Sequence, residues 1–322
     1  METKNNRLAP PMIALVSVAL FAGTYIVPIL ALNIVFIVFC PLPLFWAYLK
    51  GGASSGRQGA LMASVAVLGI SFFTHGIWAG IPYLFFVALA VGASEIYARG
   101  FSRLYMLLAG ALLAGLVNVG YFVLLAWSHG QGVIAYWKAL WLGAANAMMA
   151  YYGQAGVGSA ELDMISQTMY TVVDVLCHLA VALTVVNYLV ITWINLFMLN
   201  RMAVAKGLKF NYQRLHTWRA PDKLAWVLIF SAVMVWLGGG FLYWLGLNIL
   251  LLCATVYVFQ GLSVAAYFCD LKNVPLWARV LMLTVMIFMI YLAAAIAFIG
   301  LFDTWFDWRK LNQGQKDNPG GI

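Results

Sequence analysis

The fold is decided by FLYWLGLNILLLCATVYVFQGLSVAAYF at 241–268, a run of 28 residues without one charged side chain. About 20 apolar residues in a helix cross the roughly 30 Å hydrocarbon core of a bilayer. Lipid offers no hydrogen bonds to an exposed backbone, and a helix satisfies its backbone groups internally. The run does not alternate apolar and polar residues, as a membrane β-strand would. It therefore predicts a transmembrane helix.

The same signal recurs along the chain. The 322 residues are 65% hydrophobic and 9% charged, whereas soluble domains average about 25% charged residues. We predict an all-α fold, a polytopic transmembrane helical bundle of about nine spans. The predicted spans are 8–27, 29–49, 59–76, 78–98, 104–128, 168–199, 223–239, 241–269 and 276–301.

Lysine and arginine concentrate in alternate turns between these spans. Cytoplasmic loops of membrane proteins carry an excess of these two residues. With the N-terminus inside, 14 of the 18 basic residues are cytoplasmic: Lys4, Arg7, Lys50, Arg57, Arg99, Arg103, Arg201, Lys206, Lys209, Arg214, Arg219, Lys223, Lys272 and Arg279. Lys138, Arg309, Lys310 and Lys316 fall outside. This predicts a multi-pass protein of the bacterial cytoplasmic (inner) membrane with a cytoplasmic N-terminus and a periplasmic C-terminus.

The segment 132–152 is nearly long enough to span the membrane. If it did, the basic loop from Arg201 to Lys223 would move outside. We therefore predict an interfacial or re-entrant helix here, rich in the aromatic rings that settle at headgroup depth. The predicted organisation is a six-span part at 1–200 with an interfacial segment at 130–165, a basic cytoplasmic loop at 201–223, a three-span part at 224–302 and a polar tail at 303–322.

Ionisable and amide side chains inside spans are the candidates for a binding site, because polar groups are costly in hydrocarbon. Asp174 and His178 in the predicted sixth span are four residues apart and share one helical face. They could relay protons or bind a substrate, or they could pair structurally. Asn118, Asn248 and Gln260 are candidates to line a cavity, and otherwise to form interhelical hydrogen bonds.

Two further groups of charges lie near span ends. Glu95 stands four residues before Arg99, which predicts a local ion pair. Asp303, Asp307 and Arg309 in the tail form either an ion-pair cluster that ends a helix or a gate that recognises something at the external mouth.

Common catalytic and metal-binding motifs are absent from the sequence. It has no nucleotide-binding glycine loop after a strand, no nucleophile elbow and no HExxH. Its four cysteines are not at metal-ligand spacing. The positive charge is spread among short connections instead of forming one patch. We expect no metal, no cofactor, no nucleic-acid partner and no enzyme activity, and the expected contact is the lipid bilayer.

Three segments carry a resemblance to a known family. FQGLSVAAYF at 259–268, GLFDTWFDWRK at 300–310 and PLPLFWAYLKGG at 41–52 resemble the YybS-like family of bacterial membrane proteins, a domain of unknown function. The hydropathy pattern is also similar to that of substrate-binding subunits of energy-coupling-factor transporters. The family resemblance implies no particular activity, but this transporter-like pattern together with Asp174 and His178 leads us to expect binding or transport of a small-molecule substrate. The alternative is a non-transporting scaffold for cell-envelope assembly that binds a membrane-protein partner through cytoplasmic loops.

Overall fold

The computed structural model describes residues 10–26, 29–208, 210, 218–275, 277–279, 281–282, 285 and 289–310. Throughout these residues the regular elements are α-helices, which confirms the predicted all-α class. The chain divides into two compact units, residues 1–210 (unit 1) and 211–322 (unit 2), and each is described by itself. Lys4, Arg7, Lys209, Arg214, Lys316 and parts of the first and last predicted spans lie outside the described residues.

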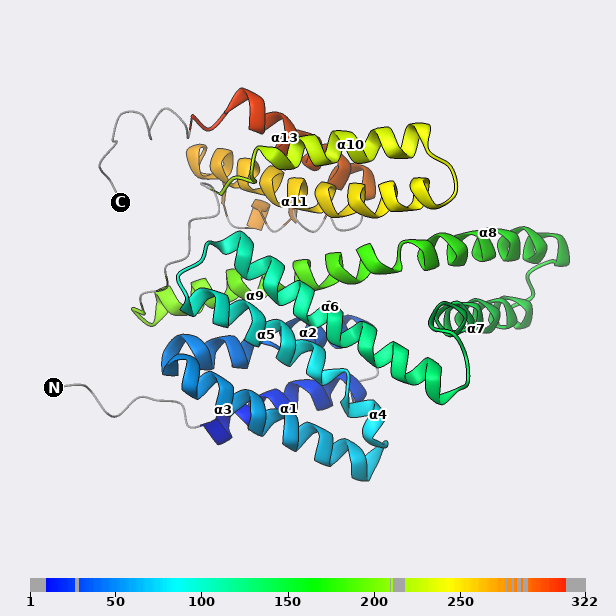
Figure 1. The fold of residues 1–322 in the computed structure, drawn as a ribbon, viewed down its shortest axis with the longest axis horizontal. Helices are drawn as coiled ribbons and strands as arrows, with labels where there is room; N and C mark the ends of the chain where they lie inside the picture. The colour runs from blue at the N-terminus through cyan, green and yellow to red at the C-terminus, as the bar shows by residue number, and fades with distance from the viewer. Residues whose placement is uncertain are drawn as a thin grey trace. The chain divides into compact units, whose positions relative to one another are not determined.

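Figure 1 shows the helices of both units. Unit 1 contains α1 (Pro10–Ile26), α2 (Leu30–Phe39), α3 (Leu42–Thr74), α4 (Ile77–Gly80), α5 (Tyr83–Ala98), α6 (Arg103–Ser128), α7 (Val133–Gln154), α8 (Ser159–His178) and α9 (Ala180–Ala205). Unit 2 contains α10 (Lys223–Leu237), α11 (Phe241–Leu271) and α13 (Ile290–Phe306).

Five stretches of the described chain are long and apolar enough to cross a membrane: Leu32–Thr74, Ile77–Ala98, Leu104–Ser128, Ala180–Ala205 and Phe241–Leu271. The shorter apolar helices are Pro10–Ile26, Lys223–Leu237 and Tyr291–Phe306. The prediction of a membrane protein with several transmembrane helices is confirmed at this level. The count of nine spans is not.

The first of these stretches is too long for one crossing. Its 43 residues would extend about 65 Å as one straight helix, against roughly 30 Å of hydrocarbon. It is interrupted at Cys40 and Pro41, and again at Gly52, whose φ of +74° suits glycine. Cys40 and Pro41 fall inside the predicted span 29–49, which the structure divides, and Gly52 lies between that span and the predicted span 59–76.

Close helix packing in unit 1 depends on small residues. A Cβ atom on Gly92 of α5 would lie 2.9 Å from the carbonyl oxygen of Ala109, and one on Gly110 of α6 would lie 2.9 Å from the carbonyl oxygen of Leu89. The two backbones can approach this closely because neither glycine carries a side chain. Helix α6 also packs along α9. The interior of unit 1 is thus a tightly packed helical bundle.

One end of unit 1 gathers the basic turns. The turn between α5 and α6 and the end of α9 lie together there, at the left in Figure 1. The guanidinium of Arg57 donates two hydrogen bonds of 2.7 Å to the Glu95 carboxylate. The prediction that Glu95 pairs locally with Arg99 is therefore wrong, because the main partner of its carboxylate is Arg57. A residue on the neighbouring helix α3 reaches the carboxylate bidentately.

Helices α7 and α8 form a hairpin, α7–α8, in which the two helices pack mainly on each other. Figure 1 shows α8 continuing the line of α9 past the other helices of the bundle. The predicted sixth span, 168–199, starts too early, because α8 ends at His178 and the apolar span is Ala180–Ala205. Segment 132–152 is helical, as predicted, within α7. Its depth in the membrane stays a prediction.

In unit 2, α11 packs against both α10 and α13. Gly246 of α11 allows close contact with α10, since a Cβ there would lie 2.9 Å from the Met234 Cβ. Helices α11 and α13 touch at Gly261 and Gly300, where added Cβ atoms would overlap the carbonyl oxygens of Ile296 and Tyr257. This contact sets the register of α13 on α11.

Candidate functional site

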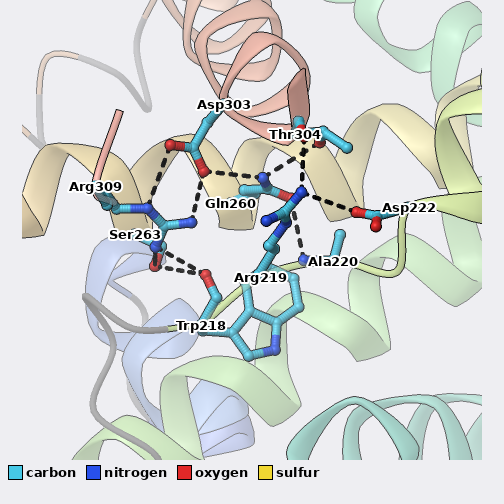
Figure 2. A network of polar contacts seen from close by, with 9 residues as sticks. All are labelled: Trp218, Arg219, Ala220, Asp222, Gln260, Ser263, Asp303, Thr304 and Arg309. Atoms are coloured by element: carbon cyan, nitrogen blue, oxygen red, sulfur yellow. Dashed lines mark hydrogen bonds and ion pairs between the residues drawn. The ribbon is translucent and has the colours of Figure 1, made fainter. Parts of the chain in front are cut away.

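The largest cluster of buried polar side chains described in unit 2 lies where three segments meet: residues 218–222, the middle of α11 and the end of α13. Figure 2 shows it in detail. We call it the polar network, and its members are Trp218, Arg219, Ala220, Asp222, Gln260, Ser263, Asp303, Thr304 and Arg309.

An ion pair between Asp303 and Arg309 forms its centre. The two residues are only 1% and 3% exposed. Arg309 Nη2 donates to Asp303 Oδ2 over 2.7 Å, and Arg309 Nε donates to Asp303 Oδ1 over 3.4 Å. Helix α13 ends at Phe306, and the φ of +44° at the following residue, Asp307, turns the chain and lets Arg309 reach back to a residue six positions earlier. Charges this deeply buried need a partner, and here each supplies the other.

Gln260 links this ion pair to the backbone of residues 218–220. Its Nε2 donates to Asp303 Oδ2 over 3.2 Å and to Thr304 Oγ1 over 3.4 Å. Its Oε1 accepts a hydrogen bond of 3.0 Å from the backbone N–H of Ala220. A fully buried amide therefore bridges the end of α13 and a segment that is not helical.

Ser263 and the two arginines complete the contacts with residues 218–222. Arg309 Nη1 donates to the Trp218 carbonyl oxygen over 2.9 Å and to Ser263 Oγ over 2.8 Å. Arg219 Nη2 donates to the Thr304 carbonyl oxygen over 2.7 Å and to Asp222 Oδ1 over 3.0 Å. The hydroxyl of Ser263 also bonds the Trp218 carbonyl, at 3.0 Å. Side chains thus satisfy backbone groups that no helix satisfies.

The hydrogen bonds and ion pairs shown in the polar network are made between groups of the chain itself. Two arginines are balanced by two aspartates, and the named donors and acceptors bond one another or the chain's own backbone. Irregular backbone at membrane depth is tolerated only where protein groups or a wet cavity satisfy it. The geometry fits a structural junction that holds residues 218–222 against α11 and α13.

The polar network corrects one part of the predicted topology. The positive-inside pattern predicts the loop 201–223 inside and the tail 303–322 outside, which would separate them by the full hydrocarbon thickness of roughly 30 Å. The structure places Arg219 and the Thr304 carbonyl 2.7 Å apart, and Trp218 and Arg309 2.9 Å apart. Residues 218–220 and 303–309 therefore lie side by side, an arrangement that does not fit a loop and a tail on opposite membrane surfaces.

Within the predicted tail cluster, Asp303 and Arg309 meet, while Asp307 caps the helix through its backbone N–H to the Asp303 carbonyl, at 3.1 Å. The sequence prediction missed Trp218, Arg219, Ala220, Ser263 and Thr304. Two of the segments that carry the family resemblance, 259–268 and 300–310, contain Ser263 and Thr304. Their resemblance to a family was the available signal, although it could not reveal which residues touch.

Asp174 and His178 lie on α8, outside the apolar span of α9. Their side chains are 48% and 41% exposed. Lys138 of α7 reaches Asp174 Oδ1 at 3.2 Å, and His178 Nδ1 lies 2.8 Å from the Asp174 carbonyl oxygen. The lysine is a partner that the sequence prediction did not include. These three titratable groups form a surface cluster on the α7–α8 hairpin.

The predicted binding residues do not form one site. Asn118 Nδ2 donates to Tyr188 Oη over 3.1 Å, which links α6 to α9 as the interhelical alternative predicted. Asn248 donates to the Trp244 carbonyl of its own helix over 2.8 Å. It lies 12 residues before Gln260 on α11, about 18 Å along the axis. Asn248 and Gln260 belong to unit 2, whereas Asn118, Asp174 and His178 belong to unit 1.

A small recess lies at the basic end of unit 1. Its volume is about 10 Å³, room for roughly one water molecule. The lining residues are Phe45, Tyr48, Leu49, Ser94, Tyr97, Met106, Leu196, Leu199 and Phe210. Neither Asp174 nor His178 is among them. A recess of this size does not hold a small-molecule substrate.

Removing the exposed ion pair between Lys138 and Asp174 should have only a small effect on the stability of the protein. We expect Asp174→Asn to change the free energy of unfolding by less than about 1 kcal/mol, because half-exposed charges interact weakly and are screened by salt. Denaturant titration in detergent micelles at low and high salt measures this. A loss above about 2 kcal/mol would contradict a surface role for the cluster.

Comparison with known proteins agrees with the membrane assignment. No curated protein and no solved structure matches the chain. A family model described as "Predicted membrane protein (DUF2232)" matches residues 14–304, which is most of the sequence. The narrower resemblance to YybS-like proteins and to energy-coupling-factor subunits stays a prediction. The chain belongs to the DUF2232 family of predicted membrane proteins.

Proposed function

We propose that the protein is a non-enzymatic, non-transporting scaffold of the bacterial cytoplasmic membrane, and that the α7–α8 hairpin is its docking arm for another cell-envelope protein. Unit 1 would cross the membrane six times, through α1, the two parts of the α2–α3 stretch, α4–α5, α6 and α9. The basic turns would lie in the cytoplasm. The hairpin would then lie on the periplasmic side.

The hairpin's surface is the observation that carries this proposal. Large apolar side chains are exposed on both helices, including Ile134 at 80%, Tyr151 at 68% and Met164 at 68%. On α8 the apolar residues stand among polar and acidic ones such as Glu161, Asp163 and Gln167, whereas α7 carries few polar residues, among them Lys138 and Asn146. Apolar side chains with polar neighbours outside an apolar span favour a protein interface.

Charge favours a protein over lipid as the occupant. Helices that lie on membrane surfaces are rich in lysine and arginine, which attract anionic headgroups. The hairpin carries Glu161, Asp163 and Asp174 against Lys138, a net charge of −2 with histidine neutral. The complementary partner is a protein segment that presents apolar side chains beside basic ones.

Site-specific photocrosslinking in intact cells tests the docking arm. A photoreactive amino acid at Met164 should give one adduct of defined mass with another protein. The same probe at Phe230 of α10, which is 67% exposed on an apolar helix, should give lipid adducts only. Glu161→Lys with Asp163→Lys should abolish the protein adduct, and Asp270→Lys should leave it intact. Adducts with lipid alone at Met164, or with a second copy of the chain alone, would refute the proposed docking.

The rival function is binding or transport of a small molecule, and the cluster of Lys138, Asp174 and His178 supports it. A carboxylate, an imidazole and an ammonium within hydrogen-bonding reach could move protons. Under the scaffold proposal, Asp174→Asn cells should keep wild-type growth and wild-type crosslinking at Met164. Loss of a saturable uptake activity in this variant, with crosslinking unchanged, would favour transport.

A further inference from the structure

We infer that the polar network is a fastener that fixes the end of α13 on the same membrane face as the basic segment 201–223, so that the C-terminus is cytoplasmic. The inference uses the proposed orientation of the basic turns, and it does not depend on what the hairpin binds. It requires an even number of membrane crossings between residues 222 and 303.

Hydrogen bonds fix both ends of this path. Ala220, three residues before α10 begins at Lys223, donates to Gln260, and Arg219 donates to the Thr304 carbonyl near the end of α13. Figure 1 shows α10 leading away from this end of unit 2, α11 returning to it, and α13 ending there. A chain that leaves one membrane face and ends beside its starting point has crossed an even number of times.

The distribution of basic residues supports the same conclusion. With a cytoplasmic C-terminus, Arg309, Lys310 and Lys316 join the residues inside. The count of basic residues on the cytoplasmic side rises from 14 to 17 of 18, and only Lys138 remains outside. The positive-inside rule is therefore obeyed better than with a periplasmic tail.

The fastener works through desolvated groups. The Trp218 carbonyl and the Ala220 N–H have partners on Arg309, Ser263 and Gln260. Trp218 and Ala220 are 4% and 3% exposed. If Asp303 loses its charge, the buried charge of Arg309 loses this ion pair, and opening the junction to water relieves the resulting penalty. Residues 218–222 and the end of α13 should then open together.

Topology reporters test the inference on the wild-type chain. Green fluorescent protein fused after Ile322 should fluoresce, and alkaline phosphatase fused at the same place should be inactive. Phosphatase fused after Gly130, in the turn between α6 and α7, should be active. An active phosphatase after Ile322 together with an inactive one after Asp222 would place the two ends on opposite faces and overturn the inference. Crosslinking at Met164 is unaffected by either result, which separates this test from that of the docking arm.

Cysteine labelling tests the fastener itself. In a chain whose native cysteines are replaced, Ala220→Cys should react slowly with maleimide because the position is 3% exposed. Adding Asp303→Asn should raise the labelling rate at least about tenfold by increasing local opening. Adding Asp270→Asn, at an exposed ion pair of the same unit, should leave the rate unchanged. Equal rates in the Asp303→Asn and Asp270→Asn chains, at equal abundance in the membrane, would overturn the fastener.

Discussion

Asp303→Ala should lower the free energy of unfolding by about 3–5 kcal/mol, the largest effect we expect from a single substitution. The cause is the charge left behind. Arg309 is 3% exposed, and its guanidinium would keep its hydrogen bonds to Trp218 and Ser263 while losing the ion pair with Asp303. Removing one partner of a buried pair costs more than removing both.

Unfolding in mixed detergent micelles measures this effect. The matched control is Asp270→Ala, because Asp270 pairs with Arg279 where both side chains are partly exposed, and there we expect less than about 1 kcal/mol. The double variant Asp303→Leu with Arg309→Met should be less destabilised than the sum of its single variants, since it leaves no buried charge. Equal losses for Asp303→Ala and Asp270→Ala would show that the ion pair is solvated and would contradict the buried junction.

Gly261→Ala should destabilise the protein by about 1–3 kcal/mol, the range typical of an overpacked core. A Cβ at this position overlaps the carbonyl oxygen and side chain of Ile296, and backbone atoms cannot turn aside as a flexible side chain can. Helix α13 would have to move away from α11. That shift would also lengthen the hydrogen bond from Gln260 to Asp303.

Gly120→Ala is the matched control for this substitution. Gly120 lies within α6 with open space around the position of a Cβ. Alanine favours a helix interior over glycine by roughly 0.5–1 kcal/mol, so this control should be neutral or stabilising. We expect the same unfolding titration to show a loss of stability for Gly261→Ala and no loss, or a gain, for Gly120→Ala. Stabilisation by Gly261→Ala would mean that α11 and α13 do not approach as described.

The membrane character of the fold was predictable from sequence because it depends on local composition. Uncharged runs such as 241–268 can exist as helices only where lipid or protein covers them, whatever the rest of the chain does. The positions at which the apolar helices bend or begin were harder to predict. Gly52 bends a continuous apolar stretch through one backbone angle, and the apolar span starting at Ala180 excludes Asp174 and His178, which the sequence had placed inside it.

The polar network was only partly predictable, because its contacts join residues far apart in sequence. Asp303 and Arg309 could be paired from their spacing, and Gln260 stood out as an amide within an apolar run. Nothing local indicated that a backbone N–H at Ala220 would reach the Gln260 side chain 40 positions away. Glu95 gives the same lesson, since its neighbour Arg99 was the nearest cation in sequence and Arg57 was the nearest in space.

The central claim is that the α7–α8 hairpin lies outside the bilayer, opposite the basic face. Single cysteines at Gln167 on the hairpin, at Leu116 on the apolar surface of α6 and at Asp222 beside α10 test it with a membrane-impermeant maleimide. We expect the cysteine at 167 to react in intact spheroplasts, the one at 222 only after permeabilisation, and the one at 116 in neither state. A cysteine at 167 that stays protected in intact spheroplasts, while the one at 222 reacts, would contradict the account.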